Sequence, residues 1–252
     1  MAHIHPDVLI LDEFHNYQIP TETLAYEARS FLLQKKYRHK AMKLVISSAT
    51  LNIELVQEYF KDVSKDIPII KIPGRTFGVK SDYDASGDYL DALDSAIKAK
   101  HNTLFFVSGK KEIESHIQEI QRKFGNLVET FPLHSELTRA EQDAILKNTS
   151  KKPRIIVSTN VAEESITIDY IDFVISTGEQ KVLRYNEYGI PMLGVEETSL
   201  ANEKQRAGRS GRTKPGIFKR FNNTPSKDLK AFPEAPLERE MIEREILIFL
   251  SQ

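Results

Sequence analysis

Short apolar runs alternate with amphipathic helical patterns along almost the whole chain, and this alternation restricts the fold more than any other feature. The apolar runs stand at Val8–Leu11, Lys43–Ile46, Ile67–Ile72, Thr103–Val107, Leu127–Phe131, Arg154–Val157, Phe173–Ile175 and Gly216–Phe221. Helical patterns stand at Thr21–Lys35, Ile53–Phe60, Gly87–Lys100, Lys110–Phe124, Arg139–Lys147 and Asn202–Gly208. Continuous apolar runs indicate strands that are buried on both faces. The sequence therefore predicts an α/β fold of parallel sheets with helices on both faces.

The chain has room for more than one domain. Its 252 residues suffice for two domains of ordinary size. The stretch Ile72–Gly78, IPGRTFG, places a proline and two glycines after an apolar run and is a candidate boundary. A further helical pattern, Ala235–Leu250, follows a proline-bearing stretch, so we expect it to begin a third module.

Composition excludes several classes of protein. With 40% hydrophobic and 28% charged residues the chain is typical of a globular protein. No apolar run reaches the ~18–20 residues of a membrane span. The absence of cysteine excludes disulfides and thiolate metal sites, and it suits an intracellular protein, which we expect in the cytoplasm rather than the nucleus. A net charge of −1 means that any nucleic-acid contact depends on local clusters.

Two short polar motifs follow the first two apolar runs. Asp12 and Glu13 come directly after Val8–Leu11, and Ser47-Ser-Ala-Thr50 follows Lys43–Ile46. A buried strand that delivers two carboxylates to its end is typical of half of a nucleotide site. Taken alone, however, an acidic pair is more often a solvated loop or a helix cap, and the serine motif is a plausible cap. If the strands are neighbours, the hydroxyls lie beside the acidic loop.

The motif Gln205–Arg212, QRAGRSGR, carries the strongest single signal. Arg209 and Arg212 are three residues apart and point the same way on a helix or its frayed end. Gly208 and Gly211 leave space for a close approach of phosphate. Two convergent guanidiniums suit a triphosphate. The alternative is a basic surface loop that contacts nucleic acid or nothing, but the spacing favours the phosphate interpretation.

Two further turns follow predicted strands. Ser158–Asp169 supplies hydroxyls and backbone N–H groups that suit phosphate or ribose oxygens. Thr103–Ile113 combines a strand, a Ser-Gly turn and a helix, and its Gly-Lys-Lys could contact a phosphate. Each is equally consistent with an ordinary strand-to-helix connection.

Together the motifs resemble a superfamily 2 helicase of the DExH-box class, closest to the DEAH/RNA-helicase-A family. The segments DEFH, SSAT, IPGRTFGV, TLFFVSGKKEIE, HSELTRAEQ, STNVAEESITID and QRAGRSGRTKPGIFKRF follow in family order and at family spacing. The resemblance implies the carboxyl half of a first RecA-like domain at 1–72, a second RecA-like domain at 73–234 and the start of a winged-helix-like module at 235–252. The implied function is part of an NTP-dependent RNA helicase or translocase that uses ATP or another NTP with Mg²⁺.

The resemblance also implies a role for each matching residue of the first segment. Asp12 would hold Mg²⁺ through water, together with Glu13, and Glu13 would act as base or water-positioning group. His15 would couple this site to the second domain. Three residues would transmit the state of the site: Ser48, Ala49 and Thr50.

The implied roles in the second domain concern nucleotide and RNA. Arg209 and Arg212 would be arginine fingers on the triphosphate, and Gln205 would help to place the attacking water. The implied nucleotide-binding residues are Ser165, which also places the water, and Thr167 and Asp169 on the ribose side. The implied contacts to the RNA backbone are Ser108, Gly109, Thr159 and Asn160, which would recognise phosphates rather than bases.

The sequence departs from the family in three respects. No G-x-x-x-x-G-K-[ST] phosphate loop is present, because the single Gly-Lys pair, Gly109-Lys110, continues Lys-Glu. We therefore expect a missing amino-terminal part of the helicase, an incomplete first sheet with an unfilled or partner-covered edge, and a chain that is inactive alone. Asn16-Tyr17 replaces the usual Glu-Arg, and Leu146 stands where a base-stacking phenylalanine is common. Both favour a viral or divergent relative with little selectivity among nucleotides.

The alternative function is a non-catalytic RNA- or protein-binding fragment of helicase ancestry.

Overall fold

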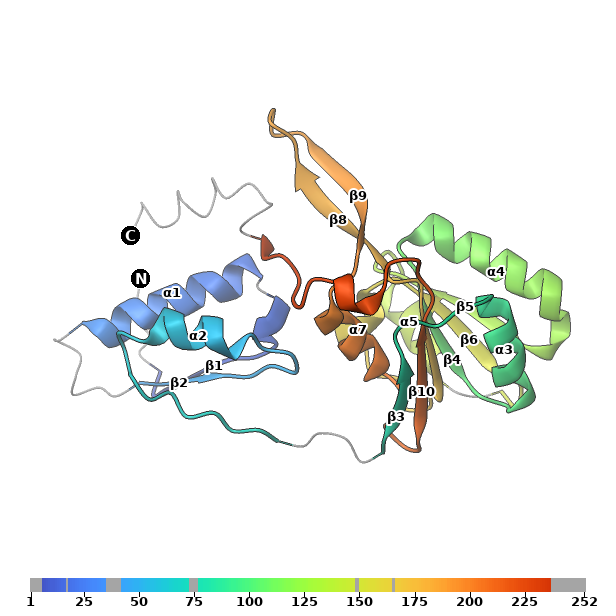
Figure 1. Ribbon diagram of the computed structural model, residues 1–252, viewed down its shortest axis with the longest axis horizontal. Helices are drawn as coiled ribbons and strands as arrows, with labels where there is room; N and C mark the ends of the chain where they lie inside the picture. Colours follow the sequence, from blue (N-terminus) through green and yellow to red (C-terminus); the bar gives the residue numbers. More distant parts are fainter. Residues whose placement is uncertain are drawn as a thin grey trace. The chain divides into compact units, whose positions relative to one another are not determined.

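The computed structural model describes residues 6–16, 18–34, 42–72, 77–147, 150–164 and 166–236 (Figure 1). The chain divides into two compact units. The first unit comprises Met1–Ile72, Arg184–Met192 and Glu234–Gln252, and the second comprises Pro73–Leu183 and Leu193–Pro233. The helix expected at Ala235–Leu250 lies outside the described residues except for its first two positions.

A six-stranded sheet forms the centre of the second unit. Its strands are β3 (Val79–Asp82), β4 (Thr103–Phe106), β5 (Glu129–Leu133), β6 (Arg154–Ser158), β7 (Phe173–Ser176) and β10 (Gly216–Arg220). They lie in the order β3-β10-β7-β4-β6-β5, and every neighbouring pair is parallel. The prediction of a parallel α/β fold is therefore confirmed for this unit.

Helices cover both faces of this sheet, as predicted (Figure 1). Successive residues of β4 point to opposite faces. Phe105 packs in one core with α3 (Tyr89–Lys98) and α4 (Lys110–Phe124), whereas Leu104 and Phe106 pack in the other core. That second core also takes residues from α5 (Arg139–Leu146), α6 (Val161–Glu164) and α7 (Leu200–Ala207). Two short 3-10 helices complete the unit: Gly125–Leu127 and Ser226–Asp228.

Side-chain caps mark the start of α3, α5 and α7 in the second unit. The Asp88 carboxylate accepts a hydrogen bond from the Leu90 amide at the start of α3. Capping boxes open α5, at Thr138 and Glu141, and α7, at Ser199 and Asn202. Such caps satisfy amides that have no partner inside the helix. Because α7 begins at Leu200, the helix starts two residues earlier than the sequence pattern predicts.

The first unit is built on a two-stranded parallel sheet within its described residues. β1 (Val8–Leu11) pairs with β2 (Lys43–Ile46), and α1 (Ile19–Leu33) and α2 (Ile53–Phe60) pack with them. A 3-10 turn, Phe14–Asn16, follows β1. The core of this unit includes Leu11, Phe14, Val56 and Phe60. The strands are half-buried, because Val8, Ile10 and Val45 are 48%, 63% and 45% exposed.

The strands differ from the sequence-based expectation in three respects. The apolar run Ile67–Ile72 is not a strand: it is an extended connection in which Ile70 and Ile72 are 83% and 82% exposed. The fifth strand begins at Glu129 rather than Leu127, because Gly125–Leu127 forms a 3-10 turn. The pattern also missed β3 and a hairpin of β8 (Glu179–Tyr185) and β9 (Pro191–Glu197).

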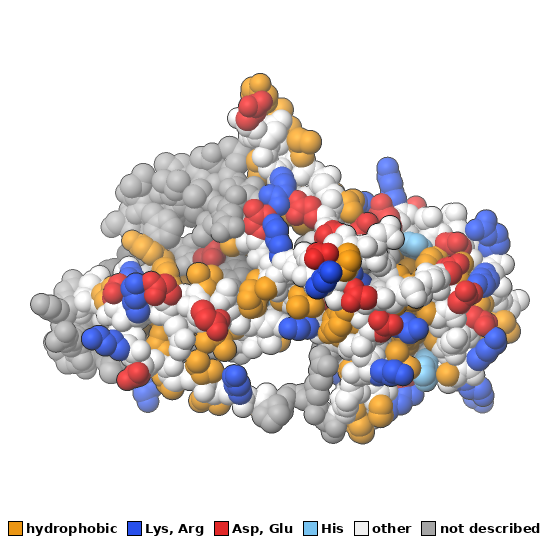
Figure 2. Space-filling view, in the orientation of Figure 1, with side chains coloured by type: hydrophobic (Ala, Val, Ile, Leu, Met, Phe, Trp, Pro, Cys, Tyr) orange, Lys and Arg blue, Asp and Glu red, His pale blue; other side chains and the backbone are white. Residues whose placement is uncertain are grey.

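The hairpin exposes apolar side chains, and the surface of the second unit carries both acidic and basic side chains. Several large apolar side chains of the hairpin are exposed: Tyr188, Ile190, Met192, Leu193 and Val195. Figure 2 shows hydrophobic side chains along this hairpin and interspersed basic and acidic side chains over the second unit. None of the helices in the described ranges combines the length and apolar character that crossing a membrane requires.

Candidate functional site

The acidic motif and the serine motif lie side by side in the first unit. β1 and β2 are parallel neighbours, so their carboxyl ends meet at one edge. The amide of Ser47 donates to the Leu11 carbonyl oxygen over 2.9 Å, and the amide of Phe14 donates to the Ser47 carbonyl oxygen over 3.1 Å. The pairing of the two strands thus continues into the two motifs and holds them together.

His15 braces the acidic loop against the serine motif. Its ring is 5% exposed, and Nδ1 lies 2.9 Å from Ser48 Oγ. The same Ser48 oxygen accepts a hydrogen bond from the Thr50 amide over 3.3 Å, whereas Ala49 is exposed. The structure therefore brings together His15 and two of the three predicted coupling residues.

The two carboxylates of this loop remain open to solvent. Asp12 and Glu13 are exposed, and Asp12 Oδ1 accepts a hydrogen bond from the Glu13 amide over 3.0 Å. Glu13 has φ 51°, an uncommon left-handed conformation for a residue other than glycine. Its Oε2 lies 3.4 Å from Nδ1 of His15. The loop thus presents two carboxylates in a fixed, unusual turn.

A second group of predicted residues gathers at the carboxyl edge of the sheet in the second unit. β4 and β6 are parallel neighbours, which places Ser108 and Gly109 beside Thr159 and Asn160. The Val107 amide donates to the Ser158 carbonyl oxygen over 2.9 Å and links the two turns. Ser108 is 6% exposed, Thr159 is half-buried and Asn160 is exposed. All four expected RNA-contact residues therefore share one edge.

A lysine from the hairpin lies against this edge. Lys181 of β8 donates to Glu112 of α4 over 2.9 Å, and this hydrogen bond lowers the pKa of the Glu112 carboxyl. A Cβ at Gly109 would stand 2.3 Å from Lys181 Nζ. A larger residue here would therefore require the Lys181 side chain to move. Lys181 was not predicted as a site residue, because the hairpin that carries it was not predicted.

The arginine motif lies at the end of α7 and rests on the segment after α6. Arg209 Nη1 donates to the Ile166 carbonyl oxygen over 3.2 Å, and Arg212 Nη1 lies 3.6 Å from Asp169 Oδ1. The Thr213 hydroxyl donates to the Asp169 carbonyl oxygen over 3.1 Å. Both guanidiniums therefore lie against one short stretch, 166–169. This agrees with the prediction that two arginines three residues apart point the same way.

The remaining predicted residues differ in exposure. Gln205 is 9% exposed on α7, whereas Thr167 and Asp169 are exposed. Ser165 lies outside the described residues. Gly211 has φ 74°, and a Cβ there would stand 2.6 Å from Val79 Cγ2. Tight packing on β3 and a left-handed backbone thus favour glycine at this position, and the predicted room for phosphate stays a prediction.

Arg212 and Asp169 were predicted as separate contacts to one nucleotide, and the structure places them next to each other. The Arg212 side chain is 30% exposed and that of Asp169 is 71% exposed. An exposed ion pair at 3.6 Å is weak, worth about 0–1 kcal/mol. A polyphosphate can therefore displace Asp169 from Arg212 at little cost.

Comparisons with known proteins agree with this organisation. The family model for the helicase conserved C-terminal domain matches residues 88–214. The ATP-dependent RNA helicase HrpA of Escherichia coli (strain K12) is 31% identical over 225 residues, which cover 84% of this chain and 17% of that protein. The HrpA homolog of Haemophilus influenzae is 31% identical over 234 residues, or 86% of this chain and 17% of the relative. The chain thus spans about a sixth of the length of these relatives.

A solved structure shows the same fold. The E. coli DExH-box NTPase HrpB superposes with a TM-score of 0.76 at 26% identity, over 96% of this chain and 31% of that one. The family match includes the arginine motif and both turns of the predicted RNA edge. The chain therefore belongs to the helicase conserved C-terminal domain family, within the DExH-box group of superfamily 2 helicases.

Proposed function

We propose that this chain supplies the acidic loop, the arginine pair and part of the RNA-binding surface of an NTP-dependent RNA helicase or translocase. The observation that carries the proposal is the placement of Arg209 and Arg212 on one segment, 166–169, which lies between α6 and β7. Two guanidiniums on one short segment have a natural ligand in a polyphosphate, because arginine binds phosphate oxygens through planar, paired donors.

The acidic loop fits a Mg²⁺ ion that arrives with the nucleotide. Mg²⁺ keeps several waters and is commonly held by one or two carboxylates together with substrate phosphates. Asp12 and Glu13 offer two such carboxylates, and the described residues contain no cluster of three acidic or histidine ligands that would hold the ion alone. When bound, the ion would neutralise charge on the β- and γ-phosphates. Glu13 would orient or deprotonate the attacking water.

Each group of residues has a distinct task in this proposal. His15 and Ser48 hold the acidic loop in place through their 2.9 Å contact. Arg209 and Arg212 stabilise the charge that develops on the transferred phosphoryl group. The 252 residues contain no phosphate loop. We propose that a different part of the helicase supplies that loop, and that the chain alone does not turn over NTP.

The edge formed by Ser108, Gly109, Thr159 and Asn160 would bind the RNA backbone. Hydroxyl, amide and backbone N–H groups are suited to phosphate and sugar oxygens, and they carry no direct base recognition. These four residues include no aromatic side chain on which a base could stack, which favours contacts to the backbone over contacts to bases. We therefore propose single-stranded RNA as the partner, bound without strong sequence preference.

The names of the relatives favour an enzyme over a binding module. Both HrpA proteins are named ATP-dependent RNA helicases, and HrpB is named an NTPase. The 2.9 Å contact between His15 and Ser48, which holds the acidic loop in place, suits an enzyme as well.

RNA binding by the 252-residue chain tests this proposal directly. Asn160→Ala should weaken the binding of a fluorescent single-stranded RNA several-fold, measured by anisotropy at two salt concentrations. Asn126→Ala is the matched control, because Asn126 is also exposed but lies in the 3-10 turn that precedes β5, at the opposite edge of the sheet. Equal affinity of the Asn160 variant and the parent chain, or no binding of RNA by either, would contradict the proposed RNA edge.

A further inference from the structure

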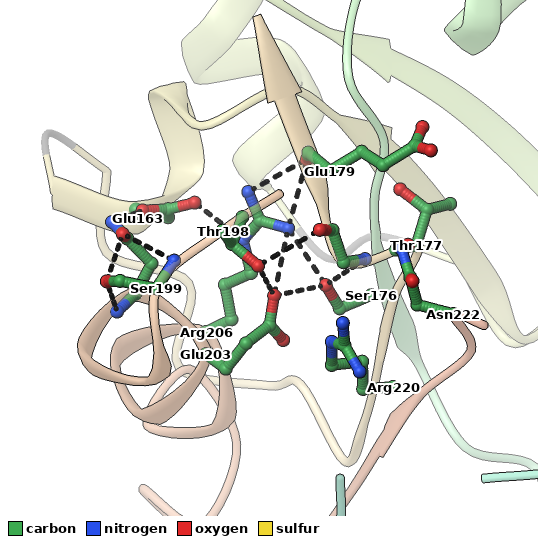
Figure 3. Close-up of polar contacts among 12 residues, drawn as sticks. Glu163, Ser176, Thr177, Glu179, Thr198, Ser199, Glu203, Arg206, Arg220 and Asn222 are labelled. Carbon is green, nitrogen blue, oxygen red and sulfur yellow. Dashed lines mark hydrogen bonds and ion pairs between the residues drawn. The ribbon is translucent and has the colours of Figure 1, made fainter. Parts of the chain in front are cut away.

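A cluster of buried polar side chains lies under α7 at the carboxyl edge of the large sheet (Figure 3). Arg206 and Glu203 of α7 are fully buried, and Glu163 of α6 is 2% exposed. Two hydroxyl side chains complete the cluster: Ser176, at the end of β7, and Thr198, just after β9. None of these five residues is among the predicted site residues, although Arg206 lies inside the arginine motif.

The guanidinium of Arg206 is the centre of this cluster. Its Nε donates to Glu163 Oε1 over 2.6 Å, and its Nη1 donates to Ser176 Oγ over 2.8 Å. Nη1 and Nη2 also donate to the carbonyl oxygen of Glu179, the first residue of β8, over 3.4 and 3.3 Å. The guanidinium carbon lies 5.0 Å from the ring centroid of Phe106 in β4. One side chain thus contacts α6, β7, β8 and β4.

The carboxylate of Glu203 closes the base of the hairpin. Its Oε1 accepts hydrogen bonds from the hydroxyls of Ser176, over 3.0 Å, and Thr198. The amide of Thr198 donates to the Gly178 carbonyl oxygen over 3.0 Å, and the amide of Gly178 donates to Ser176 Oγ over 3.0 Å. Both ends of the hairpin, at Gly178 and at Thr198, are therefore fastened to α7.

The charges in the cluster depend on one another. Burial acts to lower the pKa of Arg206, but the charges of Glu163 and Glu203 outweigh it and raise the pKa above its ordinary value. Taking these groups out of water is costly, and removing one partner leaves another charge buried without compensation. Helix α7 therefore cannot shift relative to α6 or the hairpin base without breaking hydrogen bonds that water does not replace.

We propose that Arg206 is a positioning residue, which holds α7, α6 and the base of the β8–β9 hairpin as one body. Any displacement of the hairpin base is then carried to the helix that precedes Arg209 and Arg212. Glu163 gives the same body a link to the turn that holds Thr159 and Asn160, because its amide donates to the Asn160 carbonyl oxygen over 2.8 Å. Whether such a displacement alters NTP turnover through Arg209 and Arg212 rests on the proposed function. The existence of the mechanical unit does not.

Native-state hydrogen exchange on the 252-residue chain tests the mechanical unit without requiring activity. Amides that open together share one protection factor. Gly178 and Thr198 report on the hairpin base, and Glu203 and Gly208, whose amides donate to the Ser199 and Lys204 carbonyl oxygens, report on α7. In the parent chain we expect these four protection factors to agree within about threefold, as one opening unit requires.

Glu163→Gln keeps the shape of the side chain and removes its charge. We expect the four protection factors to fall together by at least about tenfold, as for an opening unit that loses a buried charge partner. The Val107 amide, which donates to Ser158 in the sheet core, should change much less. The side-chain Nε–H signals of Arg209 and Arg212 should shift or broaden in nitrogen-15 spectra. Ser176→Ala, which removes an oxygen that joins Arg206, Glu203 and Gly178, should give the same pattern if Glu163→Gln does not fold.

Arg154→Met is the matched control. Arg154 is also a buried arginine of the second unit, 2% exposed, but it contacts Tyr170 and the Lys147 carbonyl oxygen, and its guanidinium stacks on the ring of Phe131. It should lower protection without singling out the four reporter amides and should leave the Arg209 and Arg212 signals in place. The proposal is overturned if the hairpin and α7 amides differ in the parent chain, if they respond separately to Glu163→Gln, or if the arginine signals do not respond. Because no arm uses RNA or NTP, failure here leaves the proposed function untouched.

Discussion

In both units predicted site residues follow strands, but the strands of the two units differ greatly in burial. β4, β6 and β7 of the second unit are buried at every position, whereas β1 and β2 of the first unit alternate between exposed and more buried positions. In the sequence all five strands are similar apolar runs. The difference shows that the burial of a strand depends on its neighbours in the sheet, which a single run of residues does not reveal.

The same contrast extends to the functional residues. In the second unit a buried arginine with two carboxylates fixes the helix that leads to Arg209 and Arg212. In the first unit Asp12 and Glu13 are exposed, and one contact from His15 to Ser48 braces their loop. The arginine pair is therefore held in a buried, cross-linked setting, whereas the acidic loop is exposed, and under the proposed function the acidic loop needs a phosphate loop as a further partner.

Steady-state phosphate release by the chain alone would break this contrast most clearly. Without a phosphate loop to hold the β- and γ-phosphates, the chain should hydrolyse ATP negligibly, even with RNA present. Turnover near the ~1–100 s⁻¹ that is typical of kinases would mean that the first unit is already competent. A chain carrying Glu13→Gln controls for contaminating ATPase, because it should release phosphate at the same background rate.

A pair of core substitutions measures the difference in burial. Phe105 is fully buried in the second unit, so Phe105→Ala should lower the free energy of unfolding of that unit by about 3–5 kcal/mol. Ile10 is 63% exposed in the first unit, so Ile10→Ala should change the free energy of unfolding of the first unit by about 0.5 kcal/mol or less. Urea unfolding followed by circular dichroism gives both values. A similar cost for the two substitutions would show that β1 is buried by a partner.

The strands and helices of the second unit show which parts of the fold the sequence alone predicts. Its buried strands are continuous apolar runs between amphipathic helices, so both their existence and their parallel arrangement were predictable. β3 was missed because it is an edge strand with the polar sequence VKSD. Ile67–Ile72 was wrongly predicted as a strand because an apolar run reveals nothing about whether a neighbouring strand is available.

The candidate site was predictable to a similar extent. Motif order placed the acidic loop beside the serine motif and the four predicted RNA-contact residues at one edge, because parallel strands bring their carboxyl ends to one edge. The arginine pair follows a helix, α7, and its position came from the spacing of its motif. The cluster around Arg206 was not predictable, since Arg206 is one of three arginines in QRAGRSGR and nothing local marks it as buried. Its partners Glu163 and Ser176 are 43 and 30 residues away in the sequence. Only the folded chain shows which arginine is structural.

A smaller effect is expected at the brace of the acidic loop. Ser48→Ala removes the hydroxyl beside His15 and should destabilise the first unit by about 1 kcal/mol. Hydrogen exchange of the Phe14 amide, which donates to Ser47, should accelerate accordingly. Ser64→Ala is the control, because the Ser64 hydroxyl donates to the Asp66 carbonyl oxygen in an exposed turn of the same unit. Equal effects of the two substitutions would contradict the prediction that Ser48 holds the acidic loop in place.

The smallest effect concerns pH and lies in the second unit. Burial lowers the pKa of His116 below its ordinary value of 6.5, although Glu119 and Glu112 act in the opposite direction. The unfolded chain therefore takes up the proton first as the pH falls. The contribution of His116 to stability is fully present above about pH 6.5 and is lost as the pH falls through that value, until the folded state is protonated as well. His116→Gln should flatten the decline in stability between pH 7.5 and 5, measured by urea unfolding, and an unchanged slope would contradict this assignment.

The arginine pair is best tested by turnover in a helicase polypeptide that contains these residues together with a phosphate loop. If Arg209 and Arg212 act on charge that develops in the transition state, Arg212→Lys should lower kcat far more than it raises KM. Lysine keeps the charge but loses the planar pair of donors that suits phosphate. If the motif is only a basic surface that binds RNA, the substitution should be nearly silent at saturating RNA. A kcat within about twofold of the parent value, a barrier change of only ~0.4 kcal/mol, would contradict the proposed role of the pair.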